Sequence, residues 1–156
     1  MAARRTRTGS FEVERTTGSF EVLDRLFVYG TMRQGQTARS IIANSITRVM
    51  PAKASGQIFW FSMGYPGYVE NTKGTVVGEV LWLSDLAATF GLLDAYEGQD
   101  FARTLTQVTI DASPTNHLAG ETLWTWIYSL ADPASAALGT LIPDGDWVRH
   151  WTEQNG

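Results

Sequence analysis

The stretch LFVYGTMRQG, residues Leu26 to Gly35, decides how the rest of the chain is interpreted. The apolar run Leu26–Val28 predicts a short buried strand. Gly30 follows that strand, and glycine can adopt backbone angles that are closed to other residues, as can Gly35 further along. A strand that ends in such a loop presents successive backbone N–H groups, which can bind a carboxylate or phosphate without a basic side chain. A simple turn between a strand and a helix is the alternative use of the same residues.

The same stretch nearly matches a nucleotide-binding P-loop. Gly30 and Gly35 have the required separation, and Thr37 stands where that motif ends. The motif also needs a lysine that reaches the phosphates, but this chain has Gln36 at that position. The missing cation argues against ATP or GTP binding.

Length and composition indicate one folded domain. The chain has 156 residues, and its hydrophobic content of 44% with six tryptophans is enough for a sizeable core. We expect residues 25–156 to form the domain and residues 1–24 to be an N-terminal arm or an added hairpin. That first segment repeats TGSFEV at residues 8–13 and 17–22, and we have no functional account of the repeat.

Charge and residue types exclude several classes of function. A formal net charge of -4 argues against a nucleic-acid partner, which would favour a basic excess. The absence of Cys excludes disulfides and thiolate catalysis, and His117 and His150 lie too far apart in sequence to suggest a metal site. No apolar run is long enough to cross a membrane and no secretory signal is recognised, so we expect a cytoplasmic protein. The oligomeric state stays open.

Hydrophobic periodicity predicts more strands than helices. Strands are expected at 56–61, 76–83, 101–112 and 122–130, with an irregular or edge strand at 46–54 because of Pro51. Residues 64–68 are expected to be a turn with two exposed tyrosines. In the strand 122–130, the alternation places Trp124, Trp126 and Tyr128 on one face, where core packing is the commonest role.

Two helices complete the expected elements. A short helix is expected at 37–44, with Ile41 and Ile42 facing inward. A longer helix is expected at 84–96, with Ser84 as its N-cap and Gly98 as its stop. This pattern favours an α+β fold, with a mixed or antiparallel sheet curled around a core.

Glu97 is the carboxylate with the most unusual position. It closes the longer helix, where the negative end of the helix dipole raises a carboxyl pKa and so suits a general base. A solvated glutamate at a helix end is the alternative interpretation. Asp94 lies one turn earlier, and we expect it to organise the helix end by hydrogen bonding.

Several short motifs, taken together and in order, resemble one known family. They are Tyr29-Gly30-Thr31-Met32 with Gly35, then Tyr65-Pro66-Gly67, Gly78-Glu79-Val80, Leu93-Asp94-Ala95-Tyr96-Glu97-Gly98 with Phe101 and Arg103, Trp126-Ile127-Tyr128, and Gly145-Asp146-Trp147. Over roughly residues 25 to 150 the chain resembles the γ-glutamylcyclotransferase-like family, particularly its small γ-glutamylamine cyclotransferase branch.

This resemblance implies a small mixed β-barrel with flanking helices and a cavity at one end. It implies that the loop Tyr29, Gly30, Thr31, Met32 holds the α-carboxylate and amine region of a γ-glutamyl substrate and that Glu97 is the acid–base residue. Tyr128 matches an aromatic position that could supply a hydroxyl to the cavity. The family usually has tyrosine where this chain has Phe101, so substrate choice could be altered or activity reduced.

The implied reaction is an internal aminolysis that releases 5-oxoproline and a free amine. It needs no metal or organic cofactor, because the nucleophile is the substrate's own α-amine. The leaving amine stays open among a lysine side chain, a small polyamine and an aminoglycoside-like intermediate. The alternatives are a non-catalytic binding or regulatory domain of the same fold, and a structural module whose cavity is filled by Trp124, Trp126 and their neighbours.

Overall fold

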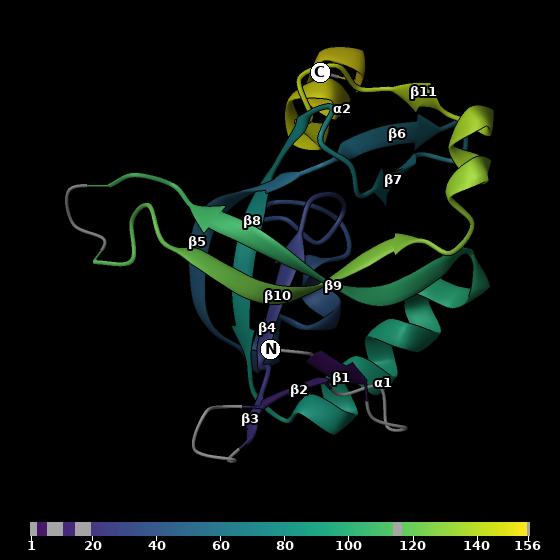
Figure 1. Cartoon of the computed structure of the whole chain (residues 1–156). Coiled ribbons are helices and arrows are strands. Elements are labelled where there is room, and N and C mark those ends of the chain that lie inside the picture. The colour runs from purple at the N-terminus through teal and green to yellow at the C-terminus, as the bar shows by residue number, and fades with distance from the viewer. Residues whose placement is uncertain (1–2, 6–10, 15–19, 114–116, 156) are drawn as a thin grey trace.

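The computed structural model describes residues 3–5, 11–14, 20–113 and 117–155, and Figure 1 shows their arrangement. The strands are β1 (Ala3–Arg5), β2 (Phe11–Glu14), β3 (Phe20–Val22), β4 (Arg25–Val28), β5 (Ile46–Ser55), β6 (Gln57–Phe61), β7 (Tyr65–Val69), β8 (Thr75–Leu83), β9 (Phe101–Ile110), β10 (Thr122–Leu130) and β11 (Thr140–Leu141). The α-helices are α1 (Leu86–Glu97) and α2 (Trp147–Asn155). Short 3-10 turns occupy Arg39–Ile41, Ala43–Ser45, Gly98–Asp100 and Pro133–Leu138.

A closed ring of strands forms the centre of the fold. Its order is β10-β4-β8-β5-β9, and β9 pairs back with β10 along the whole of β10, from Thr122↔Thr109 to Leu130↔Phe101. The contact of β10 with β4 is parallel, whereas the other contacts around the ring are antiparallel. This mixed barrel, with its flanking helices, confirms the predicted fold class.

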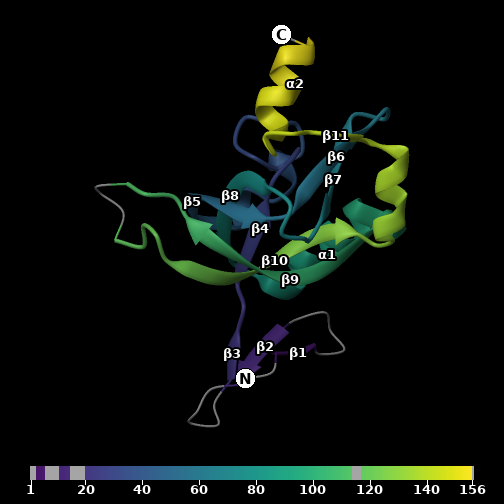
Figure 2. The same ribbon diagram turned by 45° about the horizontal axis from the view of Figure 1, so that its top comes forward.

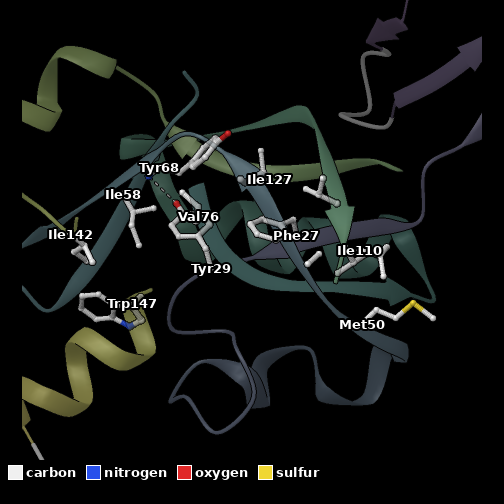
Figure 3. Packing of buried hydrophobic residues seen from close by; sticks show 14 residues of the cluster. Phe27, Tyr29, Met50, Ile58, Tyr68, Val76, Ile110, Ile127, Ile142 and Trp147 are labelled. Atoms are coloured by element: carbon white, nitrogen blue, oxygen red, sulfur yellow. Dashed lines mark hydrogen bonds between the residues drawn. The ribbon is translucent and has the colours of Figure 1, made fainter. Parts of the chain in front are cut away.

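Strand β10 also carries an extension of the barrel. The edge of β10 that pairs with β4 at Leu26 pairs with β7 at Tyr68 further along the strand. β7 pairs in turn with β6, and β6 pairs with β11. The hydroxyl of Tyr29 lies where β4 and β7 diverge. It donates to the carbonyl oxygen of Tyr128 at 2.6 Å and accepts from the backbone N–H of Tyr68 at 3.2 Å, the second of which Figure 3 marks. One buried side-chain oxygen therefore satisfies two backbone groups that would otherwise lack ladder partners.

The core has two parts, one near each α-helix. One contains Phe27, Ile110 and Ile127 of the ring strands and extends through Tyr68 to Trp147 of α2, as the side chains in Figure 3 show. The other lies beneath α1, where Phe90 and Leu93 are buried and pack with Trp126. Figure 2 shows α2 standing beyond β6 and β11, while α1 runs alongside β9 and β10. The helices thus cover different parts of the same barrel.

The prediction of a turn at 64–68 holds only at Gly64, because residues 65–68 belong to strand β7. Tyr68 is fully buried rather than exposed, while Tyr65 is partly buried. Gly67 is needed there because a Cβ would lie 2.5 Å from Cδ2 of Leu130. The turn itself is at Gly64, which has a φ of +93° and donates its N–H to the carbonyl of Phe61.

Of the two alternatives predicted for 46–54, an irregular or an edge strand, the edge strand is wrong and the irregularity is observed. β5 is itself a strand of the ring and pairs with β8 on one edge and β9 on the other. Its register with β8 shifts between Ile46 and Arg48. Its ladder with β9 covers Ala52 to Ala54, and Pro51 lies just outside that range. The N–H that proline lacks is therefore not required by that ladder. The carbonyl of Pro51 still accepts from the N–H of Asp111.

The helix predicted at 37–44 is two short 3-10 turns, although Ile42 is buried as expected and Ile41 partly so. Helix α1 begins after Asp85, whose φ is +48°, so the prediction of Ser84 as N-cap is wrong. The predicted stop is confirmed. Gly98 has a φ of +70° and donates its N–H to the carbonyl of Asp94.

Strands β1, β2 and β3 form a separate antiparallel sheet at the N-terminal end. The strand parts of the two repeat copies pair with each other, with Val13 opposite Glu21, while residues 8–10 and 17–19 of the repeat lie outside the described residues. The domain division at residue 24 and the cytoplasmic location remain predictions. Among the described residues, none of the helices has the length and apolar character needed to cross a membrane.

Candidate active site

A cavity of about 350 Å³ opens between the end of β4, the β6–β7 hairpin and the end of α1. Its wall consists of Phe27, Val28, Tyr29, Gly30, Thr31, Met32, Met63, Tyr65, Pro66, Tyr96, Glu97, Asp100, Phe101 and Tyr128. These residues come from four separate parts of the chain, which the barrel and α1 bring together.

All seven residues that the sequence predicts for the site line this one cavity. They are Tyr29, Gly30, Thr31, Met32, Glu97, Phe101 and Tyr128. β4 delivers the loop residues, α1 delivers Glu97, β9 begins at Phe101, and β10 carries Tyr128.

The loop after β4 is held from outside by charged side chains. The carboxylate of Glu79 accepts the backbone N–H of Gln34 at 3.2 Å and a guanidinium N–H of Arg39 at 2.7 Å. Arg39 also donates to the carbonyl of Met32 at 3.1 Å, and Arg33 forms an ion pair with Asp146 at 2.8 Å. The loop conformation is thus fixed by the protein itself.

Three consecutive N–H groups of this loop remain available. Within the described residues, the backbone N–H groups of Gly30, Thr31 and Met32 donate to no partner. The carbonyls of Gly30 and Thr31, in contrast, accept from Arg33 at 3.1 Å and Ala38 at 2.8 Å. The loop can therefore offer donors to an anionic group, which is the property that its sequence suggested.

Gly30 is needed for a different reason from the predicted one. Its φ is not positive, unlike that of Gly35, at +81°. A Cβ at Gly30 would lie 2.6 Å from Cγ of Pro66, which lines the cavity opposite the loop. Close packing against Pro66, rather than a special backbone angle, explains the glycine.

Burial governs the chemistry of Glu97. It raises the pKa of this carboxyl from 4.5 to about 7, which is the predicted direction, through loss of solvent around the charged form. The pKa of Tyr29 is raised by its own burial first and then by the negative charge of Glu97. A carboxyl that titrates near neutral pH on a cavity wall can both accept and return a proton.

Asp94 lies one turn earlier on α1 and is outside the cavity wall. It accepts two hydrogen bonds from Arg103, at 3.0 and 3.2 Å, and one from the hydroxyl of Tyr128 at 2.6 Å. Burial acts to raise the pKa of Asp94, but these hydrogen bonds and the charge of Arg103 outweigh it and lower the pKa below its ordinary value. Asp94 therefore ties α1 to β9 and β10.

The hydroxyl of Tyr128, which the resemblance suggested for the cavity, donates its hydrogen bond to Asp94. Its ring lines the cavity while the hydroxyl is used by Asp94. Burial and this bond raise the pKa of Tyr128 well above its ordinary value. At Phe101, which lacks a hydroxyl, the ring packs edge-on against Tyr65 at a centroid distance of 5.9 Å.

The cavity is not filled by tryptophans. Trp126 is fully buried in the core beneath α1, Trp124 is 40% exposed, and neither lines the cavity. The structural-module alternative required them to fill it, so that alternative loses its premise.

Several lining residues were not among the predicted site residues. Met63, Tyr96 and Asp100 are exposed and Tyr65 is partly buried, whereas Pro66, Phe27 and Val28 are buried. Tyr65 and Pro66 carried a signal, since they belong to a motif that supports the family resemblance. Met63 carried none, because its place depends on how the β6–β7 hairpin folds over the barrel.

Comparisons with known proteins identify the family of this chain. Residues 26–149 match the family described as gamma-glutamyl cyclotransferase, AIG2-like. No curated protein matches the sequence significantly.

Solved structures show the same fold. The YkqA protein of Bacillus subtilis is 25% identical, with a TM-score of 0.63, over 84% of this chain and 42% of that protein, so this chain spans about two fifths of it. An uncharacterised protein of Pyrococcus horikoshii is 19% identical, with a TM-score of 0.59, over 83% of this chain and 94% of its own. A mouse AIG2-like protein is 19% identical, with a TM-score of 0.52, over 72% of this chain and 81% of its own. Since the family match covers most of the sequence and the barrel and cavity agree with it, this chain belongs to the AIG2-like gamma-glutamyl cyclotransferase family.

Proposed function

We propose that the protein cyclises a γ-glutamyl group carried on an amine. The α-amine nitrogen attacks the γ-carbonyl carbon, a new C–N bond closes the five-membered lactam, and the C–N bond to the amine breaks. The products are 5-oxoproline and the free amine, with no water consumed. The observation that carries the proposal is a carboxyl of raised pKa, Glu97, in the same cavity as three unpaired backbone donors.

The loop would hold the substrate in a folded form. The N–H groups of Gly30, Thr31 and Met32 can donate to the α-carboxylate, as the resemblance implies. With the α-carboxylate held by the loop, contact with the cavity wall can keep the γ-carbonyl carbon close to the α-amine nitrogen. Holding two reacting groups in contact removes much of the entropic barrier, which is the main help that an intramolecular reaction needs.

Glu97 would move the proton. In its ionised form it accepts a proton from the α-ammonium group, so that the nitrogen lone pair can attack. The carboxylic acid then returns that proton to the departing nitrogen, and the carboxylate so formed accepts the second proton that the attacking nitrogen loses as it becomes the lactam N–H. A pKa of about 7 suits both steps, and general acid–base catalysis of this kind typically contributes roughly 10²–10⁴-fold.

The competing proposal is a binding or regulatory domain without turnover, which Phe101 keeps open. The test is to incubate the protein with γ-glutamyl derivatives of a lysine side chain, a polyamine, an aminoglycoside and simple amines, and to measure 5-oxoproline by mass spectrometry. Release from at least one compound, abolished in Glu97→Gln, supports the enzyme. Binding of these compounds without any release would support the regulatory alternative.

A further inference from the structure

The cavity has a buried inner end and an exposed outer end. Gly30, Met32 and Tyr128 are buried around the inner end. Met63 is 83% exposed, Tyr96 is 50% exposed, and both line the cavity at its mouth. If the γ-glutamyl group occupies the inner end, where the loop donors are, then the leaving amine extends toward the mouth.

The outer wall is mainly apolar and aromatic. Met63 and Tyr65 come from the β6–β7 hairpin, while Tyr96 and Phe101 come from the end of α1 and the start of β9. Such rings and a thioether provide apolar contacts for a chain or ring that lies across them. Together these four side chains make the mouth of the cavity mainly apolar, and a mainly apolar lining is typical of a small-molecule site.

The charges on this wall have one sign. The charged lining residues are Glu97 and Asp100, and no lysine or arginine lines the cavity. Within the described part of the chain, Asp100 takes part in no ion pair.

The arginines nearest the site are held elsewhere by carboxylates. Arg33 is held by Asp146, Arg39 by Glu79, and Arg103 by Asp94. A carboxylate on the leaving amine would therefore meet Asp100 without a counter-ion.

We propose that the leaving amine carries an apolar or aromatic chain and no negative charge. This inference rests on the proposed cyclotransferase function and specifies the substrate class of the same cavity. γ-Glutamyl derivatives of apolar amines are the preferred substrates, whereas γ-glutamyl amino acids and peptides, whose leaving groups end in a carboxylate, are disfavoured. A positive group on the amine is tolerated, because Asp100 lies at the mouth.

Three compounds test the proposal because they differ in one feature at a time. γ-Glutamyl-phenethylamine and γ-glutamyl-phenylalanine share the aromatic chain and differ in one carboxylate. γ-Glutamyl-ethylamine lacks both the ring and the carboxylate. Binding of each is measured by calorimetry to Glu97→Gln, in which turnover is blocked, and kcat/KM is measured with the parent protein by release of 5-oxoproline.

We expect γ-glutamyl-phenethylamine to bind about tenfold or more tightly than either of the other two compounds. Equal or tighter binding of γ-glutamyl-phenylalanine would overturn the proposed charge preference, and equal binding of γ-glutamyl-ethylamine would overturn the apolar one. If the parent protein releases 5-oxoproline from none of the compounds, the proposed function is overturned instead. The two failures are distinguishable because binding to Glu97→Gln does not depend on turnover.

Two further substitutions and one control substitution, each introduced into the Glu97→Gln protein, separate the two preferences. Asp100→Asn is expected to reduce several-fold the ratio of binding affinities for the phenethylamine and phenylalanine derivatives. The control Glu121→Gln, which removes one charge from an exposed residue outside the cavity wall, is expected to leave that ratio unchanged. Met63→Ser is expected to reduce only the ratio of binding affinities for the phenethylamine and ethylamine derivatives. Equal effects of Asp100→Asn and Glu121→Gln would show that net charge, not the cavity wall, sets the preference and would overturn the assignment.

Discussion

The last turn of α1 carries two carboxylates with opposite chemistry. Asp94 is paired with Arg103 and Tyr128, and its pKa lies below the ordinary value. Glu97 lines the cavity, and burial raises its pKa to about 7. The two carboxylates are three positions apart on one helix, so the helix itself does not explain the difference. What surrounds each group after folding decides whether it stabilises the fold or stays reactive.

The largest effect is expected from removing the reactive carboxylate. Glu97→Gln should lower kcat by about 10² or more, because the amide cannot accept the proton, while KM changes little because the loop holds the substrate's carboxylate. Glu97→Asp should also be poor, since its carboxylate is one methylene shorter. Measured release of 5-oxoproline at the parent rate in Glu97→Gln would contradict the proposed mechanism and direct attention to Asp94.

The same variant should not be less stable. The pKa of Glu97 is higher in the folded state than in the unfolded state, so this group favours folding at low pH, and that contribution is lost as pH rises through about 4.5 to 7. Glu97→Gln should therefore be as stable as the parent near pH 4 and more stable at pH 8, by roughly 1–2 kcal/mol once partial exposure is allowed for. Urea unfolding at the two pH values measures this difference.

The paired carboxylate should show the reverse pattern. Asp94→Asn removes the carboxylate that pairs with Arg103, whose side chain is only 6% exposed and lies over the rings of Phe90 and Trp126. Because the Asp94 side chain itself is 48% exposed, the free energy of unfolding should fall by about 1–2 kcal/mol, while kcat per folded molecule stays within about tenfold. The matched control is Asp111→Asn, which breaks the exposed ion pair with Lys53 and should cost less than about 1 kcal/mol. Equal losses in both variants would mean that the Asp94 pair contributes no more than a surface contact.

The pH dependence of the reaction should report Glu97 and not Asp94. Glu97 must be ionised to accept the proton, so kcat/KM should fall below about pH 7, reaching about a tenth of its plateau one unit lower. Initial rates between pH 5 and 8 measure the inflection. An inflection near 4.5 would indicate a solvated carboxylate without the burial described above.

The smallest effect on stability and activity is expected from removing the hydroxyl of Tyr128, a residue of the cavity wall that donates to Asp94. Tyr128→Phe removes the 2.6 Å bond to Asp94 but keeps the ring in place, and Arg103 still pairs with Asp94. Stability should fall by about 1 kcal/mol and kcat by less than about fivefold. Combining it with Asp94→Asn should cost less than the sum of the two, as is usual for residues that share one network. Full additivity would indicate that the hydroxyl acts independently of Asp94.

Much of the barrel could be predicted because its strands alternate clearly. The range expected for β10 is the observed one, and β8 differs by one residue at its start. β7 was mistaken for a turn because Pro66 and Gly67 are turn-forming residues in general. Here they are selected by packing, since a Cβ at Gly67 would strike Leu130 and one at Gly30 would strike Pro66. Contacts between strands distant in sequence leave no local pattern by which to recognise them.

The site was predictable to the extent that its residues belong to ordered motifs. Glu97 was found through its place at the helix end, but its burial against other elements could not be read from that place. The engagement of the Tyr128 hydroxyl by Asp94 depends on how α1 lies against β10, which the sequence pattern does not specify. The position of Met63 and Asp100 at the mouth likewise depends on tertiary packing.

The role of β10 in closing the ring has a consequence for biosynthesis. Tyr29 and Tyr128, joined by a hydrogen bond at the seam, are 99 positions apart in the chain. A nascent chain that has not yet released β10 from the ribosome therefore keeps β4 and β9 without their shared neighbour, and unpaired strand edges of this kind promote association between chains. Folding should be slow for a protein of this size, on the scale of milliseconds to seconds, because such distant contacts must form before the barrel is complete.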